Sequence, residues 1–284
     1  KNNSSIKYLS LSKFQKQLKK KNVEFIIKYI FLDFANSKFI KQHKSFQKLD
    51  FIKHLSKNIL FIDDLSLAKF YKKFKTKGFK NIKVLRPYAD IKESGIISGE
   101  KFSILNEKLK KFVNRKININ MKKILLSFGG SDLNNYSLKV LRSLKNFKYD
   151  ISIVIGPFFK KKNLDLLKKI NPKIKIIKNK SFLGRYFKES DLVVTTCGIT
   201  KYEIAAMKIP ALIIPISQIS EKKNYYFSKL GTSICLEYQP SIRKIRNSIL
   251  KLNDFNLRKS LFNSCRRVDF EGLNRILSKL NLKI

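Results

Sequence analysis

A glycine turn between an apolar strand and a helix is the stretch of this sequence best suited to hold a ligand. Asp191–Thr195 (DLVVT) predicts a buried parallel strand, which stops at Thr196-Cys197-Gly198. Apolar residues at helical spacing follow from Ile199 to Lys208, and Ile209-Pro210 ends the helix before a second strand. The free backbone N–H groups at such a turn, together with the helix dipole, favour an anionic group such as a phosphate.

Glu203 falls in the first turn of that helix, on the side where the preceding strand ends. A carboxylate in this place can accept hydrogen bonds from sugar hydroxyls, as acidic residues near phosphate turns often do toward a ribose. The alternative is that Glu203 only complements the positive end of the helix dipole. Spacing alone leaves both interpretations open.

A second glycine turn follows the strand predicted at Lys122–Phe128 (KKILLSF). Gly129-Gly130-Ser131-Asp132 leads into a helix predicted at Asn134–Leu144, and its glycines allow the backbone to approach a ligand closely. The motif is neither GxGxxG nor a P-loop. Asp132 is a candidate general base because it lies in this turn, and the alternative is that it caps the helix.

The other elements of the C-terminal half alternate between strands and helices. Strands are predicted at 150–155, 174–177 and 233–236, and helices at 163–170, 181–188, 221–230, 241–253, 257–264 and 272–280. This order predicts a doubly wound α/β domain with ligand turns after its first and fourth strands.

The N-terminal half shows a similar but weaker alternation. Strands are predicted at 23–33, 58–63 and 82–85, and helices at 10–21, 37–46 and 66–75. Residues 90–120 show no strand pattern, and an amphipathic helix is predicted within 98–112, so a domain boundary belongs there. We predict two α/β domains, 1–114 and 115–284.

Composition excludes several classes of protein. Hydrophobic residues make up 43% of the chain and charged residues 29%, which is typical of a globular protein. No apolar run is long enough to span a bilayer and no secretion signal is visible, so we expect a cytoplasmic location. The three cysteines are far apart in the sequence, which argues against a disulfide framework or a zinc cluster. We expect no metal and no cofactor.

The net charge of +42 is the strongest compositional signal. It suggests nucleic acid as a partner, but the lysines are spread over the whole chain alongside many Asn, Ile and Phe residues, all of which have A/T-rich codons. Genome base composition therefore accounts for most of the charge, and no nucleic-acid-binding motif is present. An anionic substrate or an anionic membrane surface would still be attracted by such a field. The sequence predicts no oligomeric state.

Six segments together resemble one enzyme family. They are FGGSD (128–132), TCGITKYEIAAMKIPALIIPIS (196–217), KNYYFSKLG (223–231), DFEGLNRIL (269–277), FIDDLS (61–66) and SGEKFSILNEKL (98–109). The sequence is similar in these segments to the nucleotide-sugar hydrolases of pseudaminic acid biosynthesis, which cleave UDP-2,4-diacetamido-2,4,6-trideoxy-β-L-altropyranose and are related to the family 28 glycosyltransferases. The similarity is strong in the C-terminal half and moderate in the N-terminal half.

The resemblance implies a GT-B architecture, in which two Rossmann-like domains hold a UDP-sugar between them. It implies that the turn after the fourth strand holds the diphosphate, that Glu203 binds the ribose, and that the main chain at Lys180 and Ser181 meets the uracil. It also places further substrate-binding residues at Gly129, Gly130, Ser131, Thr196, Cys197, Gly198, Ile199, Thr200 and Asn224.

The sequence departs from the family pattern in three places. The family begins with a glycine-rich loop that carries a histidine, and neither His43 nor His54 fits such a loop, so we expect the chain to lack that segment. The sugar-facing Asn-Gln pair of the family reads Ser220-Glu221 here, unless Gln218 takes its place. Cys197 replaces a smaller residue of the phosphate turn, which we interpret as a neutral change.

The function predicted from the resemblance is hydrolysis of a UDP-diacetamido-trideoxyhexose. One alternative is a glycosyltransferase of the family 28 type that uses a UDP-sugar donor. The other is a module that binds nucleotide sugar without turnover because the histidine loop is missing.

Overall fold

The computed structural model describes residues 30–33, 58–62, 81–87, 96–113, 116–178 and 180–282. The chain forms two compact units, Lys1–Leu85 and Arg86–Ile284, and each is described here by itself. The helices predicted at 10–21, 37–46 and 66–75, like both histidines, lie outside the described residues. The predicted division at residue 114 stays a prediction.

The N-terminal sheet has the strand order β1-β2-β3-β4. Its strands are β1 (Ile30–Asp33), β2 (Asn58–Ile62), β3 (Asn81–Arg86) and β4 (Ile96–Ser98), of which the first three are parallel in sequential pairs. Three of these were predicted. The prediction of no strand between 90 and 120 was wrong for β4, because a three-residue strand is too short to show an alternating pattern.

The C-terminal sheet has six strands in the order β10-β9-β8-β5-β6-β7, and every neighbouring pair is parallel. This is the doubly wound order, in which the chain starts in the middle of the sheet, moves to one edge and then returns to build the other half. Its strands are β5 (Lys123–Ser127), β6 (Asp150–Ile155), β7 (Lys175–Lys178), β8 (Leu192–Thr195), β9 (Ala211–Ile213) and β10 (Ile234–Cys235).

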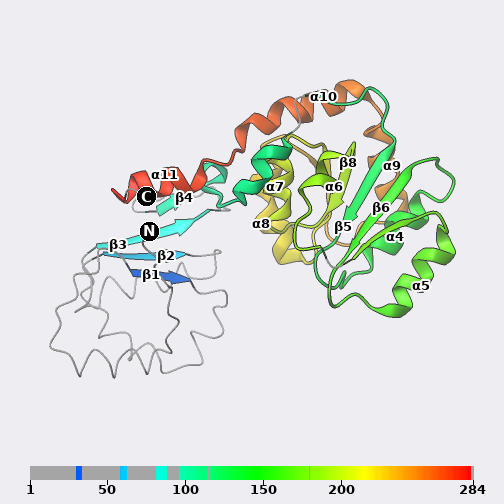
Figure 1. Cartoon of the computed structure of the whole chain (residues 1–284), viewed down its shortest axis with the longest axis horizontal. Coiled ribbons are helices and arrows are strands. Elements are labelled where there is room, and N and C mark those ends of the chain that lie inside the picture. Colours follow the sequence, from blue (N-terminus) through cyan, green and yellow to red (C-terminus); the bar gives the residue numbers. More distant parts are fainter. Residues whose placement is uncertain are drawn as a thin grey trace, which may run out of the picture. The chain divides into compact units, whose positions relative to one another are not determined.

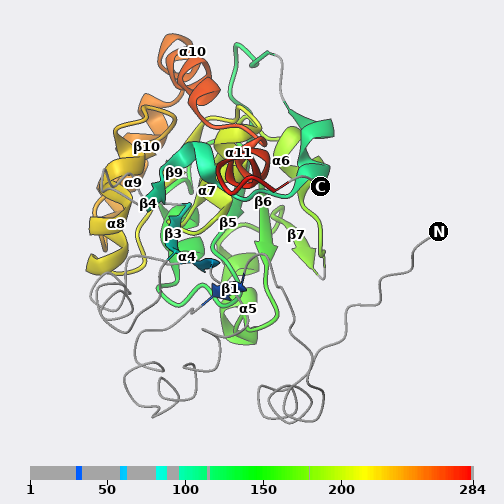
Figure 2. The same ribbon diagram turned by 90° about the vertical axis from the view of Figure 1, so that its left-hand side faces the viewer.

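Helices cover both faces of this sheet (Figures 1 and 2). They are α4 (Tyr136–Ser143), α5 (Lys161–Ile170), α6 (Gly184–Lys188), α7 (Thr200–Ala206), α8 (Gln218–Ser228), α9 (Ile242–Lys251), α10 (Phe255–Ser264) and α11 (Gly272–Lys279), with a 3-10 turn η4 at Cys265–Arg267. No described helix is both long and apolar enough to cross a bilayer.

The central strands contribute to two hydrophobic cores because successive side chains point to opposite faces. In β5, Leu126 packs into the core under α4 and α9, whereas Leu125 packs into the core under α6 and α7. In β8, Val194 and Val193 divide in the same way. Burial on both faces explains why these strands read as continuous apolar runs.

The amphipathic segment at 98–112 does not form one α-helix as predicted. It forms two 3-10 helices, η2 (Glu100–Phe102) and η3 (Glu107–Phe112), joined by an extended link. The link packs tightly against the start of α11: a Cβ on Gly272 would lie 2.1 Å from the carbonyl oxygen of Ser103. The Ser103 hydroxyl, in turn, donates to the Pro87 carbonyl at 3.1 Å. These contacts hold the link extended, which interrupts the helical pattern.

Candidate functional site

The two predicted ligand turns lie at the point where the strand order of the C-terminal sheet reverses. Strands β5 and β8 are neighbours, and the turns Gly129–Asp132 and Thr196–Ile199 follow their carboxyl ends. The Thr195 hydroxyl donates to the Ser127 carbonyl at 2.7 Å and joins the two strand ends. In doubly wound sheets the crevice outside such a reversal point is the usual ligand site.

The turn after β8 is open. Gly198 is exposed, and a Cβ added to it would meet no atom within 4 Å. The backbone N–H groups of Gly198, Ile199 and Thr200 donate no hydrogen bond within the described chain, whereas the N–H of Lys201 already bonds to the Gly198 carbonyl. The turn therefore offers unused donors at a place that a ligand can approach.

Glu203 lies in the first turn of α7 and is half-buried. Its carboxylate has no hydrogen-bond or ion-pair partner among the described residues, and burial raises its pKa above the ordinary value for glutamate. A partly buried carboxylate without a partner has free acceptor capacity. This fits the sugar-hydroxyl interpretation better than a role limited to the helix dipole.

Cys197 is not equipped to act as a nucleophile. Burial raises the pKa of its thiol to about 12, and the opposing effect of the nearby Lys201 charge is smaller. The side chain therefore stays protonated at neutral pH, and thiolate is the reactive form. The structure agrees with its interpretation as a small packing residue in the turn.

Lys201 is the residue of this site that sequence reasoning missed. It is 4% exposed, its Nζ donates to the Asn224 Oδ1 at 2.7 Å, and it lies 4.7 Å from the centre of the Phe227 ring. Burial lowers the pKa of Lys201 to about 8, which the thiols Cys197 and Cys235 only partly oppose. A helical pattern could have revealed it, because Lys201 lies three and four positions before the buried Ile204 and Ala205.

Asn224 differs from the other predicted site residues. It is 3% exposed and its amide oxygen is used by Lys201. A buried ammonium group needs a hydrogen-bond acceptor, and Asn224 supplies it. This geometry makes Asn224 a support for α7 from α8, and its role in substrate binding stays a prediction.

The turn after β5 is braced by the protein's own groups. The Asp132 carboxylate accepts from the backbone N–H groups of Tyr136 and Ser137 at 2.8 and 3.0 Å and also from the Ser137 hydroxyl. Burial raises the pKa of Asp132, and these three hydrogen bonds oppose the rise. Asp132 therefore caps α4, as the second interpretation of the sequence had it, and its oxygens are already occupied.

Glycine is favoured at the two positions of this turn for different structural reasons. Gly129 has φ +75°, a conformation that favours glycine. Gly130 lies against the turn after β6: a Cβ on Gly156 would lie 2.4 Å from the Gly130 Cα, and the Phe158 N–H donates to the Gly130 carbonyl at 3.0 Å. Both Gly129 and Gly130 remain exposed at the carboxyl edge of the sheet, and Ser131 is half-buried beside them.

The start of α8 also lies at this edge, after β9. Ser217 and Ser220 form a reciprocal capping box, and Glu221 accepts from the Tyr238 N–H at 3.1 Å. Ser220 and Glu221 are thus used by the protein itself. Gln218 is exposed and makes no hydrogen bond to the described residues, so it is the one polar side chain in this segment that remains available to a ligand.

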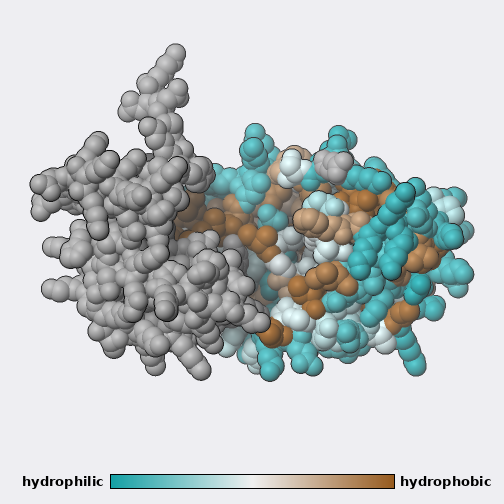
Figure 3. Space-filling view, turned by 90° about the horizontal axis from the view of Figure 1, so that it is seen from below, coloured by the Kyte–Doolittle hydropathy of each residue, from teal (hydrophilic) through white to brown (hydrophobic). Residues whose placement is uncertain are grey.

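Lys180 and Ser181 follow β7 at the same edge and are exposed. Large apolar side chains are exposed at the same edge of the sheet, at Leu133, Phe158, Ile199, Ile216 and Ile219. Figure 3 shows such apolar residues gathered among neutral ones on the described part of one face. Apolar walls with a few polar groups are common in ligand sites. In the described part of the chain no group of His, Cys, Asp and Glu could hold a metal ion.

Comparisons with known proteins agree with this geometry. The model of the glycosyltransferase family 28 C-terminal domain matches residues 101–271. The chain is 30% identical over 199 residues to the uncharacterised protein MJ1062 of Methanocaldococcus jannaschii. This alignment covers 57% of this chain and 41% of MJ1062. It is 23% identical over 168 residues to the UDP-N-acetylglucosamine–N-acetylmuramyl-(pentapeptide) pyrophosphoryl-undecaprenol N-acetylglucosamine transferase of Campylobacter hominis, covering 57% of this chain and 49% of the transferase.

Among solved structures, Acinetobacter baumannii MurG is similar in fold, with a TM-score of 0.63 at 11% identity, over 94% of this chain and 87% of that one. The fold is therefore of the GT-B glycosyltransferase type. The chain spans about half the length of the curated relatives that it matches. Since the family model covers more than half of the chain, the chain belongs to the glycosyltransferases of family 28, through their C-terminal domain.

Proposed function

We propose that the chain binds a UDP-sugar and acts as the donor-binding part of a glycosyltransferase. The observation that carries this proposal is the open turn at the reversal point of the sheet, where unused N–H groups lie beside a carboxylate without a partner. The family match supports a transferase more strongly than the hydrolase of pseudaminic acid biosynthesis.

Each part of a nucleoside diphosphate has a suitable partner in this arrangement. The N–H groups of Gly198, Ile199 and Thr200 would bind the diphosphate, and Glu203 would accept hydrogen bonds from the ribose hydroxyls. Main-chain groups at Lys180 and Ser181 would meet the base. Gln218 is the polar group that we assign to the sugar.

In the transfer step, the bond between the anomeric carbon of the sugar and the β-phosphate oxygen breaks, and an acceptor hydroxyl forms the new bond and loses its proton. The electron pair of the broken bond stays on UDP, where negative charge increases. N–H groups that already point at the diphosphate stabilise that charge without reorganisation. None of the described residues is assigned as the base, because the carboxylate of Asp132 is occupied as a helix cap.

Calorimetric titration with UDP, with ADP as the control ligand, tests the site. We expect Glu203→Gln to weaken UDP binding at least tenfold (about 1.4 kcal/mol). The matched control is Glu189→Gln, an exposed glutamate at the end of α6 that pairs with Arg185 and should leave the affinity unchanged. Equal binding of UDP by wild type and Glu203→Gln would overturn the assignment of Glu203, and no binding of UDP would overturn the donor site.

Turnover separates the three functions that remain. Release of UDP from UDP-N-acetylglucosamine only when an acceptor is present supports the transferase. Release of UDP from the diacetamido-trideoxyaltrose donor in water alone would support the hydrolase. Binding without release from either donor, with or without acceptor, would support a module that binds nucleotide sugar without turnover.

A further inference from the structure

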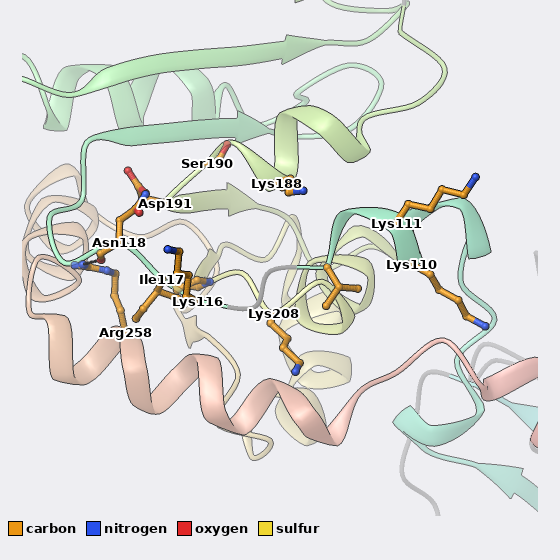
Figure 4. Close-up of a pocket in the computed structure, with 12 residues that line it drawn as sticks. Lys110, Lys111, Lys116, Ile117, Asn118, Lys188, Ser190, Asp191, Lys208 and Arg258 are labelled. Atoms are coloured by element: carbon orange, nitrogen blue, oxygen red, sulfur yellow. Dashed lines mark hydrogen bonds between the residues drawn. The ribbon is translucent and has the colours of Figure 1, made fainter.

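A basic cavity of about 750 Å³ lies at the opposite edge of the C-terminal sheet from the glycine turns. Its walls come from η3 (Lys110, Lys111), the segment before β5 (Lys116), the start of β8, the turn between α7 and β9 (Lys208) and α10. Figure 4 shows that these side chains come from separate elements, and that Lys110 and Lys111 extend away from Lys116, Lys188 and Lys208. Because β5, β8 and β9 are parallel, their amino ends share this edge, and the cavity is separate from the proposed nucleotide site.

Two charged residues of the cavity wall are fully used by the protein. The Asp191 carboxylate accepts from the Asn118 amide at 2.6 Å and from the backbone N–H groups of Lys122 and Lys123, both at 2.8 Å. The Arg258 guanidinium, 1% exposed, donates to four backbone carbonyls, those of Leu252, Asn253, Asn118 and Ile119. These bonds fix the wall. Among the described residues no lysine side chain donates to the Asp191 carboxylate, and the Arg258 guanidinium adds a positive charge to the wall.

The lysines that line the cavity are mostly uncompensated. Lys110 pairs with Glu271 at 2.9 Å, but Lys111, Lys116, Lys188 and Lys208 have no carboxylate partner among the described residues. The density of positive charge here exceeds that of the chain, since six of the twelve lining residues are Lys or Arg, compared with 62 of 284 overall. Lys208 also lines a neighbouring cavity of about 670 Å³ that contains Lys259, Arg266 and Arg267.

We propose that this cavity is a second anion site, which binds a ligand with two or more phosphate groups. A concave surface lined by one sign of charge focuses the field and raises the local concentration of counter-ions. Lysines bind phosphate as point charges, and several of them at separate positions suit several phosphates better than one. The phosphates could belong to a free oligophosphate or to the headgroups of anionic lipids. The proposal does not depend on the nucleotide site.

Calorimetric titration with tripolyphosphate at fixed ionic strength tests this site. The informative variant is Lys188→Gln/Lys208→Gln, which removes two of the uncompensated lysines. We expect it to weaken binding at least tenfold (about 1.4 kcal/mol). The matched control is Lys168→Gln/Lys169→Gln, which removes the same charge from the exposed end of α5 and should change binding less than twofold. Thermal unfolding of both variants checks that the fold is retained.

The control distinguishes a built site from the basic character of the whole chain. Equal loss of binding in the two double variants, or no binding of tripolyphosphate and of anionic vesicles by wild type, would overturn the proposal. Sedimentation with phosphatidylcholine vesicles, with and without phosphatidic acid, identifies the source of the phosphates. Vesicle binding that requires phosphatidic acid and is lost in Lys188→Gln/Lys208→Gln assigns the cavity to lipid headgroups, whereas binding of tripolyphosphate alone assigns it to a soluble oligophosphate.

Discussion

The turns after β5 and β8 have the same order of strand, glycine and helix in the sequence, but they differ in whether the protein uses the N–H groups at the start of the helix. Both join a buried parallel strand to a helix through glycine, and both lie at the reversal point of the sheet. The turn after β5 is closed by Asp132, which occupies the N–H groups at the start of α4. The turn after β8 has no such side chain, and the N–H groups before α7 stay free.

The buried charges behind the two turns differ as well. Behind the first, the carboxylate of Asp132 is satisfied by three donors. Behind the second, the ammonium group of Lys201 has one amide oxygen, two aromatic rings and no carboxylate among the described residues. The two turns therefore differ in the helix donors that the described chain leaves unused, and the proposed ligand site is the turn that keeps them. The turn after β5 then serves as a rigid wall.

The first way to break this comparison is to remove the cap of the closed turn. Asp132→Ala leaves two buried backbone N–H groups and a hydroxyl without an acceptor, and we expect it to lower the free energy of unfolding by about 2–4 kcal/mol. Chemical denaturation measures this loss. Asp165→Ala, which removes an exposed aspartate of α5, should have little effect. Unchanged stability with lost turnover would instead support Asp132 as a catalytic base.

A glycine pair tests the closed and open turns separately. Gly156→Ala places a Cβ 2.4 Å from the Gly130 Cα, so we expect a loss of stability of about 1–3 kcal/mol from overpacking. Gly198→Val adds a Cβ that lies more than 4 Å from every protein atom outside the neighbouring residues, at an exposed position, so stability should change by less than about 0.5 kcal/mol.

Gly198→Val should change UDP binding strongly, although it should hardly change stability. Added bulk at the open turn should weaken UDP binding at least tenfold, about 1.4 kcal/mol. Thermal unfolding measures the stability of Gly156→Ala and Gly198→Val, and calorimetric titration measures the UDP affinity of each. If Gly198→Val bound UDP as wild type does, the phosphate would have to lie elsewhere.

The sequence predicts the C-terminal sheet and its two turns well because parallel strands buried on both faces are continuous apolar runs ended by glycine. The GT-B fold implied by the family resemblance is confirmed. The specific expectation of a pseudaminic acid hydrolase is not supported, since the family model identifies the family 28 C-terminal domain and the matched transferase is not a hydrolase of this kind.

The spacing of apolar residues along the sequence does not predict features that backbone conformation or distant segments determine. The start of α4 was predicted at Asn134, but Asp132 and Asn135 both adopt positive φ (45° and 52°), so the helix begins at Tyr136. The burial of Lys201 depends on α8 and β10, which arrive more than fifteen residues later and bring Asn224 and Cys235. Helical spacing within 199–208 places Lys201 on the buried side of α7, but it does not reveal the groups that receive its ammonium group.

The smallest expected effect is a pH dependence that comes from Lys201. Its pKa in the folded chain is about 8, below the ordinary value of 10.5, so the folded state loses this proton first as pH rises. The unfolded state therefore binds more protons between these values, and the contribution of Lys201 to stability rises with pH; its burial cost is fully present below pH 8.

Lys201→Met removes this dependence. We expect the stability of the variant relative to wild type to be more favourable at pH 7 than at pH 10, by more than about 1 kcal/mol, because one pKa unit corresponds to about 1.4 kcal/mol. Loss of the hydrogen bond to Asn224 lowers the stability of the variant at every pH and does not alter this difference. The thiols of Cys197 and Cys265, whose pKa values are raised to about 12, give a slope of opposite sign in both proteins. Lys168→Met is the exposed control, and a constant difference for Lys201→Met across pH 7–10 would mean that the amide and the two rings compensate the buried charge fully.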